Sequence, residues 1–202
     1  MTPTEFVAGL ADVMGVERTE IATVDRALAK HGLRQLARGR YRPDINLREG
    51  VQLVCAWAGA ENRTLAADEV GRLERFFPEV IPLDEYELTK RTNPVFPRLF
   101  GVEEYELNGL NYLDIVSMVA RQLAAGTFPE DRLWIAVERG GSPLVSYWAE
   151  FKTHDLNFKQ IPIKFEFTSQ RESAVEADIN VKITASVRGT VLKWIHDVTE
   201  GA

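Results

Sequence analysis

The chain of 202 residues is long enough for one large domain or two small ones. Hydrophobic residues make up 45% of it and charged residues 27%, which is typical of a folded globular protein. The formal net charge of −6 excludes a chain that binds polyanions through its overall charge. The single cysteine, Cys55, excludes an intramolecular disulfide and a cysteine-rich zinc site.

The sequence carries no sign of export or of membrane insertion. Its N-terminus lacks the basic and apolar segments of a signal peptide. No apolar stretch approaches the ~20 residues that are needed to span a bilayer. Together with the single cysteine, which suits a reducing compartment, these features predict a cytoplasmic protein without a membrane partner.

Basic residues are concentrated in one part of the sequence. From Ala27 to Arg48 six lysines and arginines accompany a single acidic residue, Asp44, whereas the chain from Glu61 onward is net acidic. A basic segment on an otherwise acidic protein is typical of a localised electrostatic footprint for a nucleic acid.

The N-terminal residues predict two helices separated by a glycine. Phe6–Met14 carries apolar residues at helical spacing and ends at Gly15, and a second helix follows over 21–32 after a polar connector over 16–20. Two short helices joined at a glycine, with basic residues after the second, are typical of a helix-turn-helix DNA reader. The expected connector is longer than the tight turn of the simplest such proteins.

The polar face of the second helix supplies candidate base contacts. Its apolar residues recur at helical spacing and face a core, which leaves Thr23, Arg26 and Lys30 exposed. Side chains near the start of a recognition helix reach base edges in the major groove. The run Thr23–Leu28 is also similar to the Thr-Val-x-Arg-x-Leu string at the recognition helix of many bacterial regulators, and this similarity implies DNA binding.

An arginine-rich segment follows the second helix. Residues 34–43 have too little apolar periodicity for a buried element, which indicates a flexible loop or a small wing. The planar guanidinium group suits phosphate because it donates two hydrogen bonds at once. The arginines that we expect to contact phosphates are Arg34, Arg38, Arg40 and Arg42.

Two more helices and a change in composition define the expected domain boundary. Asn46 caps a helix over Leu47–Ala58, and Thr64 starts another that runs through Phe77. Four prolines between Pro78 and Pro97 then mark an irregular connection. We therefore expect a helical domain over 1–78, a linker over 79–101 and a second domain over 102–202.

The C-terminal half changes its hydrophobic period from helical to alternating. A helix over Tyr112–Ala125, capped by Asn108 or Asn111, precedes the strands, and Ser186 caps a terminal helix. Pro162 favours an edge position for its strand. The expected strands are Leu133–Glu138, Leu144–Phe151, Phe158–Thr168 and Ala177–Ser186. The predicted fold class is α+β: an N-terminal helical, helix-turn-helix-like domain followed by an antiparallel sheet of about four strands packed by two helices.

Three features of the N-terminal third are shared with a known group of proteins. They are the string Ala22–Arg26, the run Ala37–Arg40 ahead of Pro43, and the helix after it; the closing residues 183–192 match as well. The chain thereby resembles uncharacterised prophage-encoded proteins of alphaproteobacteria, which have no established activity. The resemblance implies a phage context, where a helix-turn-helix protein is usually a regulator or the DNA-recognition subunit of the packaging terminase.

The best interpretation as an enzyme is a nuclease. The runs Pro129–Asp131 and Glu150–Lys152 fit the loose pattern of metal-dependent nucleases, in which two carboxylates hold Mg²⁺ and a lysine supports the attacking water. Glu150 and Lys152 equally fit the solvated face of a strand, which is the interpretation that we favour. His31, His154 and His196 are far apart in sequence and have no metal-ligand spacing.

We therefore expect a cytoplasmic DNA-binding protein that is not an enzyme and uses no cofactor or metal. A transcriptional regulator that binds duplex DNA as a homo-oligomer, by default a dimer, is the leading hypothesis. The C-terminal domain would serve oligomerisation, a protein partner or small-ligand sensing. The alternatives are a terminase small subunit, a protein-interaction module or inhibitor without DNA binding, and a Mg²⁺-dependent nuclease.

Overall fold

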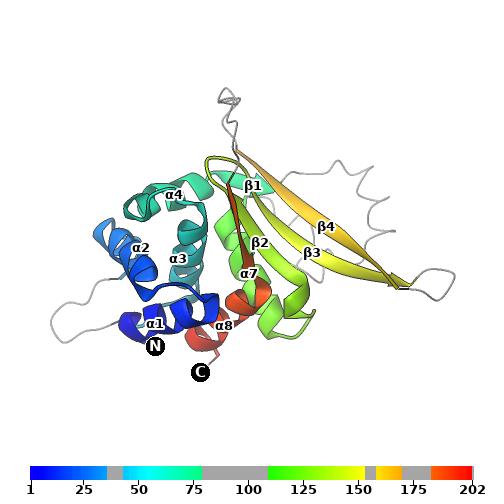
Figure 1. Cartoon of the computed structure of the whole chain (residues 1–202), viewed down its shortest axis with the longest axis horizontal. Helices are drawn as coiled ribbons and strands as arrows, with labels where there is room; N and C mark the ends of the chain where they lie inside the picture. Colours follow the sequence, from blue (N-terminus) through cyan, green and yellow to red (C-terminus); the bar gives the residue numbers. More distant parts are fainter. Residues whose placement is uncertain (36–42, 79–108, 153–157, 170–182, 202) are drawn as a thin grey trace.

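The described residues of the chain form an α+β fold with an antiparallel sheet (Figure 1). The computed structural model describes residues 1–35, 43–78, 109–152, 158–169 and 183–201. Six α-helices and five strands lie within these ranges. The fold class predicted from the sequence is confirmed, and the sheet has one strand more than expected.

Helix α1 (Pro3–Met14) ends at Gly15 as predicted and begins three residues before the expected apolar stretch Phe6–Met14. Thr2 and Glu5 form a capping box, in which each side chain accepts a hydrogen bond from the other residue's backbone N–H. Pro3 suits the first turn because the N–H that it lacks would have no partner there. At the other end Gly15 adopts a left-handed conformation with φ of 67°, which a glycine reaches without strain.

Helix α2 (Arg18–Lys30) begins three residues earlier than the predicted start at Ile21. Glu17 occupies the N-cap position, and its side chain makes no capping hydrogen bond. The first turn of α2 is polar and lacks a Ser, Thr, Asp or Asn cap, so neither a capping signal nor apolar periodicity marks its start in the sequence. The connection between α1 and α2 is therefore only three residues, Gly15–Glu17.

Helix α3 (Leu47–Gly59) is the most deeply buried helix of the described fold, since 11 of its 13 residues are buried. Asn46 caps it and Glu49 completes the capping box, as predicted. Helix α4 (Ala66–Leu73) follows a short 3-10 turn, η1 (Arg63–Leu65), and ends before the predicted Phe77. Phe77 instead belongs to β1 (Phe76–Pro78), the strand that the sequence analysis missed.

The remaining helices flank the strands in sequence. Asn111, one of the two predicted caps, is the N-cap of α7 (Tyr112–Ala124) and forms a capping box with Asp114. Arg188 occupies the N-cap position of helix α8 (Gly189–Thr199) without a side-chain capping hydrogen bond. The prediction that Ser186 caps this helix is wrong because Ser186 still belongs to the preceding strand.

The sheet has the strand order β1-β4-β3-β2-β5, and every pair is antiparallel. Its further strands are β2 (Leu133–Glu138), β3 (Pro143–Lys152), β4 (Phe158–Ser169) and β5 (Thr184–Arg188). The expected strand 177–186 begins in residues outside the described ones. Pro162 has a partner in β3, and β1 pairs with β4 only at Phe167–Ser169, so the other side of Pro162 carries no strand of the described sheet.

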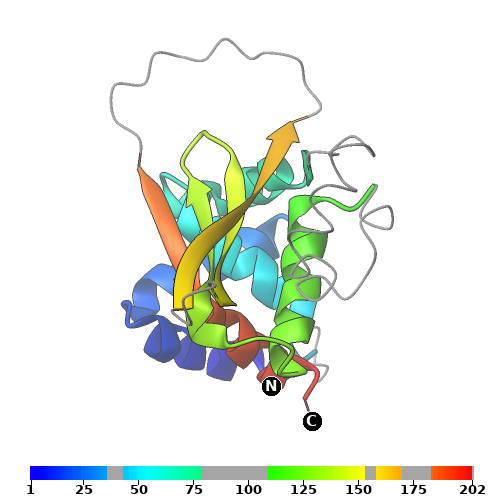
Figure 2. The ribbon, with the colours of Figure 1, turned by 90° about the vertical axis from the view of Figure 1, so that its right-hand side faces the viewer.

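One hydrophobic core joins the N-terminal helices to the sheet. It contains Phe6 from α1, Val54 from α3, Ile135 from β2 and Ile195 from α8, all with no exposed surface. Figures 1 and 2 place the N-terminal helices on one side of the sheet and the two termini side by side. The predicted linker, 79–101, lies outside the described residues, but the residues before and after it share this core.

Among the described residues, none of the helices combines the length and the apolar character that a bilayer crossing would require.

The space around two helical glycines predicts opposite effects of their substitution by alanine. A Cβ on Gly50 would lie 2.6 Å from Cγ2 of Ile195 and 2.9 Å from Cζ of Phe6. We expect Gly50→Ala to destabilise the protein by about 1–3 kcal/mol through overpacking. Gly71→Ala, in α4 with open space around it, should stabilise by up to about 1 kcal/mol. Thermal unfolding checks both, and a stabilised Gly50→Ala would contradict the described packing.

Candidate nucleic-acid interface

Helices α1 and α2 are joined by a short turn that contains Gly15. The turn is closed by two hydrogen bonds, from the Gly15 N–H to the Asp12 carbonyl and from the Val16 N–H to the Ala11 carbonyl, at 3.2 and 3.0 Å. A three-residue connection that contains glycine is the length found in DNA-reading helix pairs. The predicted longer connector over 16–20 is therefore wrong, because a tight turn of three residues joins the two helices.

The inner face of α2 is held firmly in the fold. Ile21, Val24 and Leu28 have at most 1% of their surface exposed. At the border of this face Glu20 accepts a hydrogen bond of 3.1 Å from the indole N–H of Trp57 on α3. Arg63 of η1 lies 3.5 Å from the same carboxylate. These contacts fix the rotation of α2, and so they decide which side chains it presents outward.

The outer face of α2 carries the predicted groove residues. Thr23, Arg26 and Lys30 recur at spacings of three and four, which places them on one side of a helix. Arg26 and Lys30 are exposed and Thr23 is half-buried. The Thr23 hydroxyl donates to the Thr19 carbonyl at 2.8 Å, and a terminal guanidinium nitrogen of Arg26 donates to the Thr23 hydroxyl at 3.2 Å. This face is thus organised by local hydrogen bonds, from which a base or phosphate could take the Arg26 guanidinium and the Thr23 hydroxyl.

Two further candidates on this helix were missed by the sequence analysis. Arg18 and Thr19 are exposed in the first turn of α2, where recognition helices contact bases. They were missed because the predicted helix began at Ile21. A tight turn counted from the glycine stop at Gly15 would have placed both inside the helix.

Arg34 lies inside the fold instead of facing a phosphate, contrary to the prediction. Its Nε is 2.5 Å from Oδ1 of Asp25, and a terminal nitrogen donates to Oδ2 at 3.1 Å. Both side chains are only 12% exposed. Burial raises the pKa of Asp25 above its ordinary value, and the Arg34 guanidinium opposes this shift. The pair ties α2 to the start of the arginine-rich segment.

The other three predicted phosphate contacts, Arg38, Arg40 and Arg42, lie outside the described residues. The backbone N–H of Gln35, just before this segment, donates to Glu49 at 2.7 Å, and the same carboxylate caps α3. Pro43, just after it, is buried. Both ends of the segment are therefore anchored next to α2 and α3.

The nuclease pattern is not assembled among the described side chains. Glu130 and Asp131 lie in the 3-10 turn η3 (Glu130–Arg132), whereas Glu150 and Lys152 lie on β3 with side chains outside the described set. The described part of the chain contains no group of three or more acidic, histidine or cysteine side chains that could hold a metal ion. Cys55 is fully buried, and burial raises the pKa of its thiol, which disfavours the nucleophilic thiolate.

Two histidines, His31 and His196, lie among the described residues, and each belongs to a helix or its cap. His31 is the exposed C-cap residue of α2. His196 lies on α8 with Nδ1 3.5 Å from Asp197 and Nε2 3.6 Å from Glu200. His154 lies outside the described residues. The described histidines thus sit near helix ends.

Comparisons with known proteins give no relative whose function could be compared with this site. No protein-family model, no curated protein and no solved structure matches the chain. The resemblance to prophage-encoded proteins, which rests on the quoted residues of the N-terminal third, therefore stays a prediction.

The ion pair of Asp25 and Arg34 predicts a pH-dependent loss of stability. Arg34→Ala leaves the Asp25 carboxylate buried without its partner, which should destabilise the protein by on the order of 3 kcal/mol at pH 7. The pKa of Asp25 would rise further, so the folded state would bind its proton more tightly than the unfolded state does. The stability of this variant should therefore fall as the pH rises through that pKa.

Denaturant titrations of Arg34→Ala between pH 4 and 7 measure this effect. The double variant Asp25→Asn/Arg34→Met, which leaves no buried charge, should recover most of the loss and lack its pH dependence. An Arg34→Ala protein as stable as the wild type at pH 7 would mean that the arginine is free to bind another group.

Proposed function

We propose that this chain is a phage-type transcriptional regulator that binds duplex DNA with α2 as its recognition helix. The observation that carries the proposal is the tight α1–α2 turn, after which a helix buried on one side offers hydroxyl and basic side chains on the other. Thr19, Thr23 and Arg26 would face base edges, and Arg18 and Lys30 would face the sugar-phosphate backbone.

The charge distribution supports a local contact with DNA. The exposed basic residues of α2 are Arg18, Arg26 and Lys30, and Glu20 is engaged by Trp57. The sequence adds Arg38, Arg40 and Arg42 shortly after α2. Because the whole chain has a net charge of −6, affinity for random DNA should be modest and sensitive to salt.

Dimers are the default assembly of this proposal, because a two-fold symmetric operator requires two recognition helices. A terminase small subunit would instead form a ring of many copies, so the mass in solution separates these two alternatives. A protein-interaction module would not bind DNA even at low salt. The tight turn and the basic outer face of α2 favour the two DNA-binding alternatives over this third one.

The decisive experiment compares two charge-matched double variants by fluorescence anisotropy with random duplex DNA. Arg26→Ala/Lys30→Ala removes two positive charges from the outer face of α2. Arg121→Ala/Lys193→Ala removes two from α7 and α8, where both residues form exposed ion pairs of small energetic weight. We expect the α2 variant to bind at least about tenfold more weakly, with a salt slope shallower by about 1, because Lys30 is the residue of the pair assigned to a phosphate and each lost phosphate contact lowers the slope by about 0.9.

The α7–α8 variant should bind DNA like the wild type. Equal losses in both double variants would mean that only overall charge matters, and no wild-type binding at low salt would refute DNA binding by α2. A third variant, Arg38→Ala/Arg40→Ala, tests the arginine-rich segment separately. It should lower affinity uniformly across DNA sequences, as expected for contacts to phosphates.

A further inference from the structure

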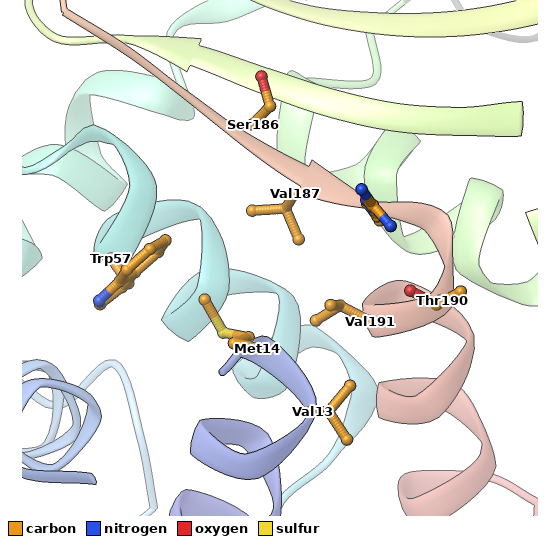
Figure 3. A pocket seen from close by; sticks show the side chains of 8 residues that line it. Val13, Met14, Trp57, Ser186, Val187, Thr190 and Val191 are labelled. Atoms are coloured by element: carbon orange, nitrogen blue, oxygen red, sulfur yellow. The ribbon is translucent and has the colours of Figure 1, made fainter. Parts of the chain in front are cut away.

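A groove of about 330 Å³ runs along the edge strand β5 (Figure 3). One wall is β5 with the start of α8, and the other is formed by the end of α1 and by Trp57 of α3. Val13 is 40% exposed there, so it offers apolar surface to the groove. The lining residues are Val13, Met14, Trp57, Ser186, Val187, Arg188, Thr190 and Val191.

Strand β5 is an edge strand of the described sheet, so one side of its backbone pairs with no other strand of that sheet. The Arg139 N–H donates to the Ile183 carbonyl at 2.9 Å, and the pairing register continues to Arg188. Since hydrogen-bonded pairs alternate in an antiparallel ladder, Val187 bonds to β2 while the N–H and C=O of Ser186 point the other way. No strand of the described sheet lies on that side of β5.

The groove also has a charge preference. Among its eight lining residues Arg188 is the one charged residue, and it is exposed. Val187 and Ser186 point to opposite faces of the strand (Figure 3), so Arg188 shares the outer face with Ser186. The Val187 side chain points toward Met14 and Trp57, and the three form the apolar floor of the groove.

We propose that this groove binds an extended acidic peptide of a partner protein, which adds a strand to the edge of β5. Strand addition supplies main-chain hydrogen bonds, and alternate side chains supply specificity. Directly opposed residues of two strands point to the same face. The peptide residue opposite Val187 is therefore apolar and covers Val13 and Met14, while the residue opposite Arg188 is an aspartate or glutamate.

A single extended segment fits this edge better than a second copy of the chain. Val13, Met14 and Trp57 form the wall that faces β5, so α1 and α3 flank the space beside the strand. A folded copy that paired its own β5 here would have to bring its own α1 and α3 into the same space. Two copies would also bring two Arg188 side chains and no acidic lining residue to the junction.

The groove lies next to the base of the recognition helix. Met14 immediately precedes the Gly15 turn, and Trp57 donates its indole N–H to Glu20 of α2. If α2 binds DNA as proposed above, a bound partner is held beside the DNA. Peptide binding itself is measured without DNA, so its failure and the failure of DNA binding are distinguishable.

The test uses fluorescein-labelled heptapeptides, titrated against the full chain by anisotropy. One alternates glutamate and valine, so every register that differs by two residues places a glutamate opposite Arg188 and a valine opposite Val187. Its matched partner alternates lysine and valine. We expect the glutamate peptide to bind on the order of tenfold more tightly to the wild type, because opposite charges across two strands attract and like charges repel.

Two protein variants locate the site. Arg188→Glu should reverse the preference between the peptides, whereas the same charge reversal at Lys164, exposed on β4, should leave it unchanged. Ser186→Pro removes an N–H that points away from β2 and should weaken glutamate-peptide binding by at least about tenfold without lowering Tm.

Three results would overturn the proposal. The first is equal or no binding of the two peptides to the wild type up to millimolar concentration. The second is an unchanged preference in Arg188→Glu. The third is full binding by a folded Ser186→Pro variant, because strand addition at this edge requires that N–H.

Discussion

The fold depends on the burial of α3 from nearly every side. Its glycines permit this, since a Cβ on Gly50 would meet Phe6 and Ile195, and one on Gly59 would lie 2.7 Å from a Val137 methyl group. α1, α8 and β2 can therefore approach the backbone of α3 closely. At its N-terminal end Arg48 forms ion pairs with Glu74 and Asp114, which joins α3 to the elements around it. Packing against a common helix thus fixes the N-terminal helices and the sheet relative to each other.

The N-terminal architecture was largely predictable because local signals agree with the fold. The stop at Gly15 gave an accurate end for α1, and the capping residue Asn46 gave a correct start for α3. The start of α2 and the strand β1 were missed, since Glu17 is a weak cap and three residues, Phe76–Pro78, become a strand only by pairing with β4. Tertiary pairing of this kind leaves no periodic signal in so short a segment.

The candidate site was predictable where it follows from helical periodicity alone. Thr23, Arg26 and Lys30 lie on the outer face of α2 because the apolar stripe opposite them is long and regular. Arg34 was assigned to phosphate because its partner Asp25 is nine residues away in sequence, and no local pattern reveals such a pair. The groove at β5 was likewise out of reach, since α1, α3, β5 and α8 meet only in the folded chain.

The continuity of the core has a consequence for how this protein can evolve. A helix-turn-helix unit on a separate domain can be exchanged between proteins as a cassette, because it carries its own hydrophobic interior. Here the interior that supports α1 and α2 also contains residues of β2 and α8, from the last third of the chain. Helix α2 would therefore be inherited together with the sheet. If α2 binds DNA as proposed, new specificity would arise by point substitutions on its outer face and not by recombination of the α1–α2 unit.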